Sequence, residues 1–510
     1  MTDRASAREA IASVTDIEAF RELAAPGGAY AAPPDGPIGW AGYDALRARA
    51  AARTGETESV VCGTGRIGAT EAVLISFEFG FLGGSLGERT GDRLEAAHTH
   101  ARERGLPVVS LIATGGSRMQ EGMRALVQLQ RVARQSTLTR DAGLPQLAVV
   151  RDPTTGGGWA TLGAGADVIL ALPGAQIGFA GSRVRPADAD PAAYTAEAQL
   201  AAGAIDAVVR EEELATTLDG WLTLLTGGPG ERGAGLGPEH VRVTDATEGA
   251  DAVRAGHTTE PPDPGRDQTA AEAIPEGRTA QTPGAGPARL PAPPPRGLGR
   301  ARLPGTGWDA VLQARSPERP PATAYLDAYF THRQAISGDR CGSTDPGMLC
   351  GFGLHDGRTV AYAAQCGTAT LPAGYRTAAR LIRLAERLGI PVLTLIDTPG
   401  AANGAEAERA GAGAAIAEVF AAVAAARVPV TSLVIGEGGS GGALALAAPG
   451  NTWVTPDSYF SVIAPELAAA ILKRGPQETR ATAGQLRLRP QDLVDLGVAR
   501  GVVPVVQPEE

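Results

Sequence analysis

Four glycine-rich turns are the stretches of this chain whose residue types and spacing could do chemistry. They read Thr-Gly-Gly-Ser at 114–117, Thr-Gly-Gly-Gly at 155–158, Thr-Pro-Gly-Ala at 398–401 and Gly-Ser-Gly-Gly at 439–442. We call the first two the N-terminal turn pair and the last two the C-terminal turn pair. Each follows an apolar run and precedes a helical pattern, so its N–H groups would lie unpaired at a positive helix end. Because glycine lets an anionic oxygen approach the backbone, two such turns side by side predict a two-donor oxyanion hole.

Other interpretations of these residues stay open. The glycines could serve only tight turns and close packing. A phosphate loop is disfavoured, since the chain has no Gly-x-x-x-x-Gly-Lys-[Ser/Thr] motif. Ser440 has no obvious His partner for nucleophilic catalysis, and Asp397 and Glu437 could act as acids or bases or could orient the loops. The residues present favour stabilisation of an enolate or oxyanion by backbone N–H groups.

The elements that position these turns repeat along the chain. Pro107 and Pro145 are 38 residues apart, as are Pro391 and Pro429, and Gly115 and Gly156 are 41 residues apart, as are Gly400 and Gly441. In each half a helical pattern, a run of Val, Leu and Ile, and a glycine-rich turn follow one another twice. Unbroken apolar strands are typical of a sheet covered on both faces. The repeat predicts two α/β domains with mostly parallel strands.

A segment of unusual composition, residues 227–296, separates the two halves. Of its 70 residues, 24 are Gly or Pro, none is aromatic and six are Leu, Ile or Val. Such a segment cannot offset the entropy of ordering by burial, so we predict a flexible, disordered linker. The predicted organisation is a helix-forming, loosely attached N-terminal segment at 1–35, a first domain at 36–226, the linker, and a second domain at 297–510.

The composition excludes several classes of protein. A net charge of −10 is unsuited to binding nucleic acid, which needs a basic surface to replace its counterions. The four Cys and six His show no CxxC or HExxH spacing, so neither zinc nor another metal is predicted. The N-terminus lacks a signal-peptide pattern, and no apolar run reaches the roughly 18 residues of a membrane span. These features predict a cytoplasmic protein that does not contact membranes.

Both halves carry motifs of a known family. Segments 77–93 (FEFGFLGGSLGERTGDR) and 152–163 (DPTTGGGWATLG) resemble the β subunit of the bacterial acetyl-CoA carboxylase carboxyltransferase. Segments 372–401, 434–447 (VIGEGGSGGALALA) and 459–466 (YFSVIAPE) resemble its α subunit. The chain is thus similar to a β subunit joined through the linker to an α subunit.

The resemblance implies a fold and a reaction. The fold would be two crotonase-like (ClpP/crotonase) domains, each a β-β-α superhelix. The reaction would move a carboxyl group from carboxybiotin to acetyl-CoA and give malonyl-CoA for fatty acid biosynthesis. Biotin would sit on a separate biotin carboxyl carrier protein and be charged by a separate ATP-dependent biotin carboxylase. Active sites between a β-type and an α-type domain across a dimer interface imply a homodimer or a larger assembly.

The resemblance also assigns roles to residues. The enolate oxygen of the acyl-CoA would meet N–H groups around Gly115–Gly116 and Gly156–Gly157, and the biotin ureido oxygen those of Gly400–Ala401 and Gly441–Gly442. The ureido anion would be the base, so no protein base is required. Five further residues are expected to contribute to cofactor binding: Gly83, Gly84, Arg118, Gly438 and Gly439. Arg118 would hold a CoA phosphate or orient its loop, with a surface salt bridge as the alternative.

Departures from the family keep other functions open. Residues 1–61 contain none of the four Cys of the zinc ribbon that many β subunits carry. Where the family usually continues after Gly400 with Tyr-Pro-Gly-Ile-Gly-Ala-Glu-Glu-Arg, this chain has AANGAEAER at 401–409. The alternatives are a carboxylase for another acyl-CoA such as propionyl-CoA, a malonyl/acyl-CoA decarboxylase built on the same domains, and a catalytically silent scaffold subunit.

Overall fold

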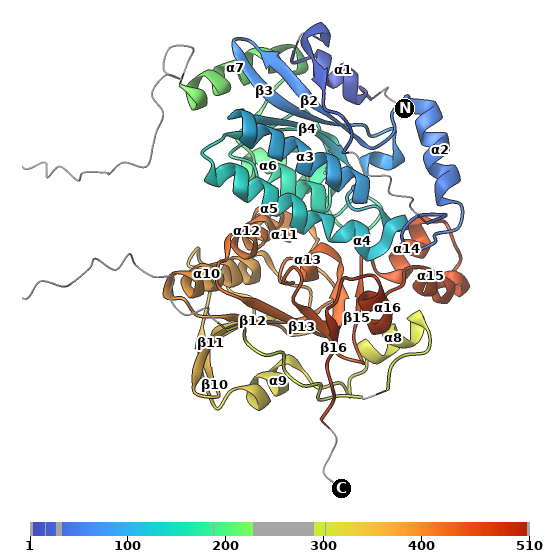
Figure 1. The fold of residues 1–510 in the computed structure, drawn as a ribbon, viewed down its shortest axis with the longest axis vertical. Coiled ribbons are helices and arrows are strands. Elements are labelled where there is room, and N and C mark those ends of the chain that lie inside the picture. Colours follow the sequence, from blue (N-terminus) through green and yellow to red (C-terminus); the bar gives the residue numbers. More distant parts are fainter. Residues whose placement is uncertain are drawn as a thin grey trace, which may run out of the picture. The chain divides into compact units, whose positions relative to one another are not determined.

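Two helix-covered sheets organise the described part of the chain, one in each half (Figure 1). The computed structural model describes residues 4–15, 17–26, 33–186, 188–227, 290–300 and 302–506. All of these residues belong to one compact unit that contains both halves. Among the helices so described, none has both the length and the apolar character that crossing a membrane requires.

The sheet of the N-terminal half combines a hairpin with a parallel layer. Its strands are β1 (Arg21–Glu22), β2 (Val60–Ile67), β3 (Thr70–Phe77), β4 (Val108–Thr114), β5 (Gln146–Thr155), β6 (Val168–Ala171), β7 (Ile177–Gly178) and β8 (Ala207–Val208). They lie in the order β1-β2-β3-β4-β5-β6-β8, with β7 beside β5. β2 and β3 are antiparallel, whereas β3 to β6 are parallel. Every residue of β4 is buried, as expected for an apolar strand covered on both faces.

Helices and short helical turns connect these strands. They are α1 (Ala7–Ala12), η1 (Ile17–Ala19), α2 (Tyr43–Thr54), η2 (Leu82–Gly84), α3 (Glu88–Arg104), η3 (Met119–Glu121), α4 (Gly122–Leu126), α5 (Gln128–Asp141), η4 (Trp159–Gly163), η5 (Pro191–Tyr194), α6 (Ala196–Ala201) and α7 (Glu211–Thr226). α3 precedes β4 and ends at Gly105, whose φ of 63° is the left-handed conformation that commonly terminates a helix. The helix therefore stops where the chain must turn into the buried strand.

The sheet of the C-terminal half has the same organisation. Its strands are β9 (His332–Ile336), β10 (Met348–His355), β11 (Arg358–Gln365), β12 (Val392–Thr398), β13 (Val430–Gly439), β14 (Thr452–Val454), β15 (Tyr459–Ser461) and β16 (Gly501–Val502). They lie in the order β16-β14-β13-β12-β11-β10-β9, with β15 beside β13. β9, β10 and β11 pair antiparallel, and β11, β12, β13 and β14 pair parallel.

The helical elements of this half are α8 (Gly307–Ala314), α9 (Ala322–Tyr329), α10 (Pro372–Leu388), α11 (Ala405–Arg409), α12 (Ala412–Ala425), α13 (Ser440–Leu444), α14 (Pro465–Ile471), η6 (Pro476–Glu478), α15 (Thr479–Gln485) and α16 (Pro490–Asp495). α10 begins with Pro372, whose missing N–H costs nothing at a first helical position, and ends at Gly389 with φ 71°. It buries one face against the sheet, including Leu381 and Ile382.

The two halves are a structural repeat. α3 and α10 each have 17 residues, β4 and β12 each have 7, α5 and α12 each have 14, and β5 and β13 each have 10. β4 begins at Val108 and β12 at Val392, a separation of 284 residues, and the other three pairs have the same separation. The predicted fold class, two α/β domains with mostly parallel strands, is confirmed.

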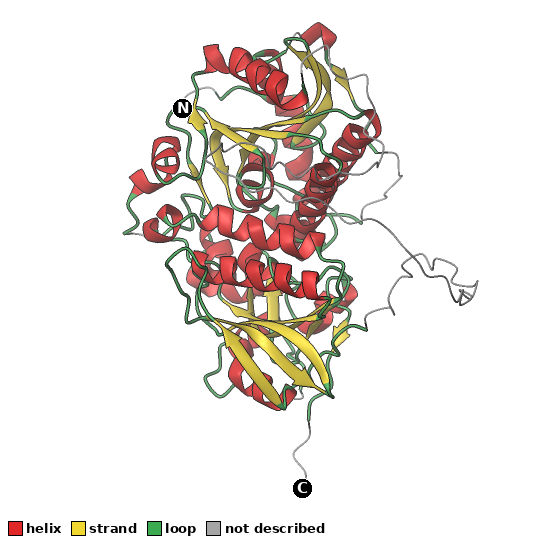
Figure 2. Ribbon diagram, turned by 90° about the vertical axis from the view of Figure 1, so that its left-hand side faces the viewer, coloured by secondary structure: helices red, strands yellow, loops and turns green. Residues whose placement is uncertain are grey.

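The halves pack against each other through helices. α5 and α12 are equivalent in the repeat, and they contact each other between the two sheets (Figures 1 and 2). One hydrophobic cluster contains buried residues of both, including Leu129 and Val132 from α5 and Ile416 and Val419 from α12. The two halves therefore pack together within one chain through equivalent helices.

The N-terminal segment and the last residues of the predicted linker differ from the prediction. α1 is not loosely attached: Ala7 and Ile11 are fully buried, and the N–H of Ala7 donates to Glu78 at 2.8 Å. At the end of the predicted linker, Thr431 donates to the carbonyl of Ala292 at 2.7 Å and Gly297 pairs with Val505. Residues 290–296 thus pack on the second domain, while residues 228–289 lie outside the described part of the chain.

Candidate functional site

The two turns of the N-terminal turn pair lie in contact where β4 and β5 end. Gly116 has φ 97° and Gly156 has φ 69°, which are backbone conformations that residues other than glycine rarely adopt. A Cβ placed on Gly156 would lie 3.1 Å from Cα of Gly116. Backbone conformation therefore favours glycine at both positions, and at Gly156 the close approach favours it as well.

Three of the four N–H groups predicted as donors in this pair already have acceptors in the chain. Gly115 donates to the carbonyl of Gly83 at 2.9 Å, and Gly156 donates to that of Gly178 at 3.1 Å. Gly116 donates to Oγ1 of Thr114 at 3.1 Å. By contrast, the N–H groups of Ser117 and Gly157 have no acceptor among the described residues.

The C-terminal turn pair has the same construction. Gly400 has φ 141°, and its N–H donates to Oγ1 of Thr398 at 3.1 Å, as Gly116 does to Thr114. The N–H groups of Ala401, Gly441 and Gly442 have no acceptor within the described residues. A Cβ on Gly442 would lie 2.5 Å from the amide nitrogen of Ala401, so only glycine lets these donors lie so close.

The repeat of 284 residues changes which glycines correspond. Gly400 is the counterpart of Gly116 rather than of Gly115, and Ala401 is the counterpart of Ser117. Two matching bridges support this register, since Leu86 pairs with Ser117 as Thr370 pairs with Ala401. Matching Gly115 with Gly400, as the glycine spacing of 41 residues suggested, is thus one residue out of register. Pro107 and Pro391, like Pro145 and Pro429, already show the correct separation of 284 residues.

The glycines predicted to bind cofactor lie in the turns or contact them. A Cβ on Gly84 would overlap the carbonyl of Ala113, and one on Gly439 would overlap Pro399. One on Gly438 would lie 2.7 Å from the ring of Phe460. Gly83 lends its carbonyl to Gly115, and its own Cβ position is open. Close packing therefore explains Gly84, Gly438 and Gly439 without a ligand.

Arg118 forms buried ion pairs, so the alternative expectation of a surface salt bridge is wrong. Its side chain is fully buried, and its guanidinium lies 2.5 Å from Glu58 and 3.3 Å from Glu121. It also donates to the hydroxyl of Tyr43 at 3.2 Å and to the carbonyl of Ser85 at 2.6 Å. Burial alone would raise the pKa of Glu58, but Arg118 lowers it to about 2. The expected orientation of the loop fits this buried network.

Asp397 and Glu437 are held in ion pairs beside the C-terminal turn pair. Asp397 lies 2.7 Å from Arg319 and accepts the N–H of Glu437 at 3.1 Å. Glu437 lies 2.6 Å from Arg315 and accepts a hydrogen bond from the hydroxyl of Tyr459 at 2.8 Å. Burial raises the pKa of Asp397, against the opposing effect of Arg319. These contacts fit the orienting role that the sequence left open.

The side chain of Leu129, in the N-terminal half, lies beside a turn of each pair. A Cβ on Gly157 would overlap Leu129, and one on Gly441 would lie 3.7 Å from the same side chain. The Gly441 position is also 3.3 Å from the ring of Phe179. A turn of each pair therefore borders Leu129, so a single chain brings the two turn pairs to one place.

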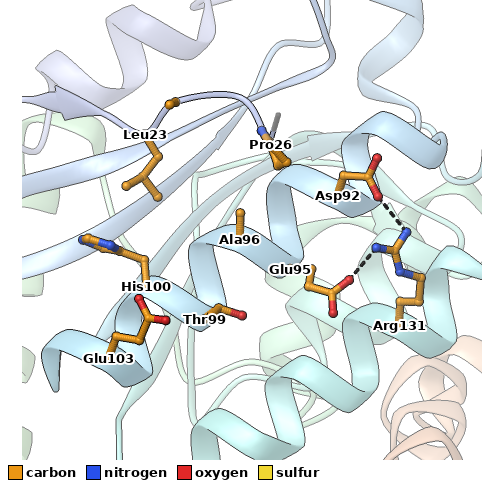
Figure 3. A pocket seen from close by; sticks show the side chains of 10 residues that line it. Leu23, Pro26, Asp92, Glu95, Ala96, Thr99, His100, Glu103 and Arg131 are labelled. Carbon is orange, nitrogen blue, oxygen red and sulfur yellow. Dashed lines mark hydrogen bonds and ion pairs between the residues drawn. The ribbon is translucent and has the colours of Figure 1, made fainter. Parts of the chain in front are cut away.

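A surface hollow described in the structure lies elsewhere. It is lined by Leu23, Pro26 and α3, with Arg131 ion-paired to Asp92 at 3.0 Å and also to Glu95 (Figure 3). It contains no residue of the four turns. Across the described ranges, no three His, Cys, Asp or Glu side chains are grouped as metal ligands would be.

Comparisons with known proteins agree with the division into halves. A family model for the carboxyl transferase domain matches residues 38–208. A model for acetyl co-enzyme A carboxylase carboxyltransferase-like domains matches residues 305–507. These ranges fall inside the two domains predicted from the sequence.

Several relatives match across both halves of the chain. The acetyl-coenzyme A carboxylase carboxyl transferase subunits beta/alpha of Saccharopolyspora erythraea is 35% identical over 90% of this chain and 74% of its own. That of Salinispora tropica is 35% identical over 99% and 83%. A probable biotin-dependent acyl-coenzyme A carboxylase beta3 subunit of Mycobacterium bovis is 30% identical over 90% and 82%. A solved structure of transcarboxylase 12S matches 98% of this chain and 87% of its own at 18% identity, with a TM-score of 0.35. No conclusion is based on this structural match. The chain therefore belongs to the acetyl-coenzyme A carboxylase carboxyltransferase family, with its β-type half before its α-type half.

Proposed function

We propose that this chain transfers a carboxyl group from carboxybiotin to acetyl-CoA and so makes malonyl-CoA. The relatives that share 35% identity over nearly the whole chain carry the name of that enzyme. The observation that carries the proposal is a repeated pair of N–H groups that have no acceptor among the described residues: Ser117 with Gly157, and Ala401 with Gly441. Two preorganised donors in each half suit a reaction in which two different oxygens become negative.

The N-terminal turn pair is the proposed site of the acyl-CoA thioester. Loss of the α-proton places negative charge on the thioester oxygen, which two N–H donors would stabilise. Ser117 and Gly157 offer such donors. We assign the role to them rather than to Gly115, Gly116 and Gly156, whose N–H groups already donate to acceptors within the chain. A lost donor of this kind typically costs about 10²–10³ in rate.

The C-terminal turn pair is the proposed site of biotin. Carboxybiotin supplies carbon dioxide there and, once decarboxylated, a ureido base for the α-proton. Ala401 and Gly441, with Gly442 beside them, would hold the ureido oxygen through their N–H groups. A Cβ at Gly442 would meet Ala401 and Tyr375, so glycine at this position is what lets the two turns lie so close.

A carboxylase for another acyl-CoA is the second candidate. The Mycobacterium bovis relative is named only for an acyl-coenzyme A. The stretch 401–409 also lacks the Tyr-Pro pair that is usual in this family. In either case we propose cytoplasmic action with a biotin carrier protein and a biotin carboxylase, as a homodimer or larger assembly.

The test uses the purified full chain with malonyl-CoA, with and without free biotin. Carboxyl transfer predicts loss of the malonyl carboxyl group that depends on biotin. Equal loss without biotin would identify a decarboxylase instead, and no loss in either condition would favour a scaffold subunit. A panel of acyl-CoA substrates with a reconstituted, carboxylated biotin carrier then distinguishes acetyl-CoA from longer chains.

A further inference from the structure

A buried carboxylate of the C-terminal half reaches into the N-terminal half. Glu408 belongs to α11 and is 1% exposed. Its Oε1 accepts the N–H of Phe179 at 2.6 Å and that of Ala180 at 3.4 Å. Its Oε2 is buried without a hydrogen-bond partner among the described residues. Burying a carboxylate is costly, so the two backbone contacts must hold it in place.

The backbone that Glu408 holds, residues 178–181, touches both turn pairs. Gly178 accepts the N–H of Gly156 from the N-terminal turn pair at 3.1 Å. The ring of Phe179 lies 3.3 Å from the Cβ position of Gly441 in the C-terminal turn pair. A shift of this segment would therefore move one turn pair relative to the other.

Few charged groups surround this carboxylate. From the N-terminal half, Arg185 lies near it with its guanidinium stacked 3.6 Å from the ring of Tyr194, and Asp190 pairs with Arg409. Glu406, on the same helix, is exposed. Burial raises the pKa of Glu408 to about 7, against the opposing effect of the two N–H groups and Arg185.

We propose that Glu408 is a positioning residue that fixes residues 178–181 and thereby sets the spacing of the two turn pairs. The inference rests on the proposed carboxyl transfer, because that reaction alone requires an acyl-CoA site and a biotin site at a fixed separation. A misplacement of about 1 Å can cost about 10²-fold in rate. Each substrate would still bind to its own half.

The experiment compares full-length Glu408→Leu, Glu408→Gln and the control Glu406→Gln with the unmodified chain. Glu408→Leu has no acceptor for the N–H groups of Phe179 and Ala180. We expect its kcat for biotin-dependent transfer to fall about 10²-fold, with the Kd for acetyl-CoA from calorimetry nearly unchanged. Glu406→Gln should match the unmodified chain. If the unmodified chain itself transfers nothing, the proposed function fails, whereas an active chain makes this comparison decisive.

Rescue by the conservative variant separates positioning from a general loss of folding. Glu408→Gln keeps a carbonyl oxygen at Oε1, so it should keep most of kcat at pH 8 while losing any inflection near pH 7. A kcat of Glu408→Leu equal to that of the unmodified chain would overturn the proposal, as would a parallel loss of acetyl-CoA binding. If Glu408→Leu does not fold, an unaltered inflection in Glu408→Gln would overturn it, and a lost inflection would support it.

Discussion

The amide nitrogen of Ala401 lies 2.5 Å from where a Cβ of Gly442 would stand, and the hydroxyl of Tyr375 lies 2.6 Å from the same point. The turn at 398–401 and the turn at 439–442 thus approach more closely than any side chain permits. Tyr375 also donates to the carbonyl of Gly442 at 3.0 Å, which fixes this glycine from the other side. The donors of the C-terminal turn pair are therefore held by close backbone packing and by the hydroxyl of Tyr375.

Gly442→Ala should displace the N–H of Ala401 and lower kcat for biotin-dependent transfer by about 10²–10³. Steady-state assays with malonyl-CoA and biotin measure the loss, and circular dichroism checks the fold. Gly484→Ala is the control, because Gly484 lies in α15 with open space at its Cβ. Normal turnover of a folded Gly442→Ala would remove this turn pair from the reaction.

Gly116→Ala should damage the use of acyl-CoA selectively. A side chain at φ 97° costs roughly 1–3 kcal/mol of strain and would shift the turn that carries Ser117. We expect the affinity for acetyl-CoA to fall at least about tenfold, measured by calorimetry. Gly174→Ala places the same kind of strain at φ 68°, in open space and outside the four turns. Equal affinities of the two variants would contradict an acyl-CoA site in the N-terminal half.

The sequence predicts the repeat because strands buried on both faces must be continuous apolar runs, and turns at their ends must be rich in glycine. This is why β4, β5, β12 and β13 end at the predicted turns. The identity of the donors could not be predicted in the same way. Whether an N–H is available depends on acceptors distant in sequence, such as the carbonyl of Gly178 for Gly156.

Buried charges were also beyond the reach of sequence pattern. Arg118 lies in a polar stretch typical of an exposed loop, and only the fold places it beside Glu58, 60 residues away. Glu408 likewise looks like an exposed residue in a charged run, yet it contacts Phe179, 229 residues away, across the junction of the halves. The sequence around either residue carries no signal for such contacts, because the two partners lie on separate elements far apart in the chain.

Arg118→Met should destabilise the chain strongly without a specific effect on acyl-CoA. Removing one partner of a buried ion pair leaves Glu58 charged and unpaired, which typically costs about 3–5 kcal/mol. Urea unfolding measures the change. The control is Arg131→Met, whose part-exposed pairs with Asp92 and Glu95 should contribute at most about 1 kcal/mol. A stable Arg118→Met with weakened acetyl-CoA binding would support the phosphate-binding role.

The elevated pKa of Glu408 makes stability depend on pH. An unfolded Glu titrates near pH 4.3, whereas Glu408 in the folded chain titrates at about 7, so between these values the folded state binds more protons. The free energy of unfolding should therefore fall as pH rises from about 5 to 8, by up to about 3 kcal/mol, and then level off. Glu408→Gln should lack this component, and Glu406→Gln should keep it. Urea unfolding of the three proteins across this pH range tests the prediction, and parallel curves for the unmodified chain and Glu408→Gln would show that Glu408 does not carry the proton.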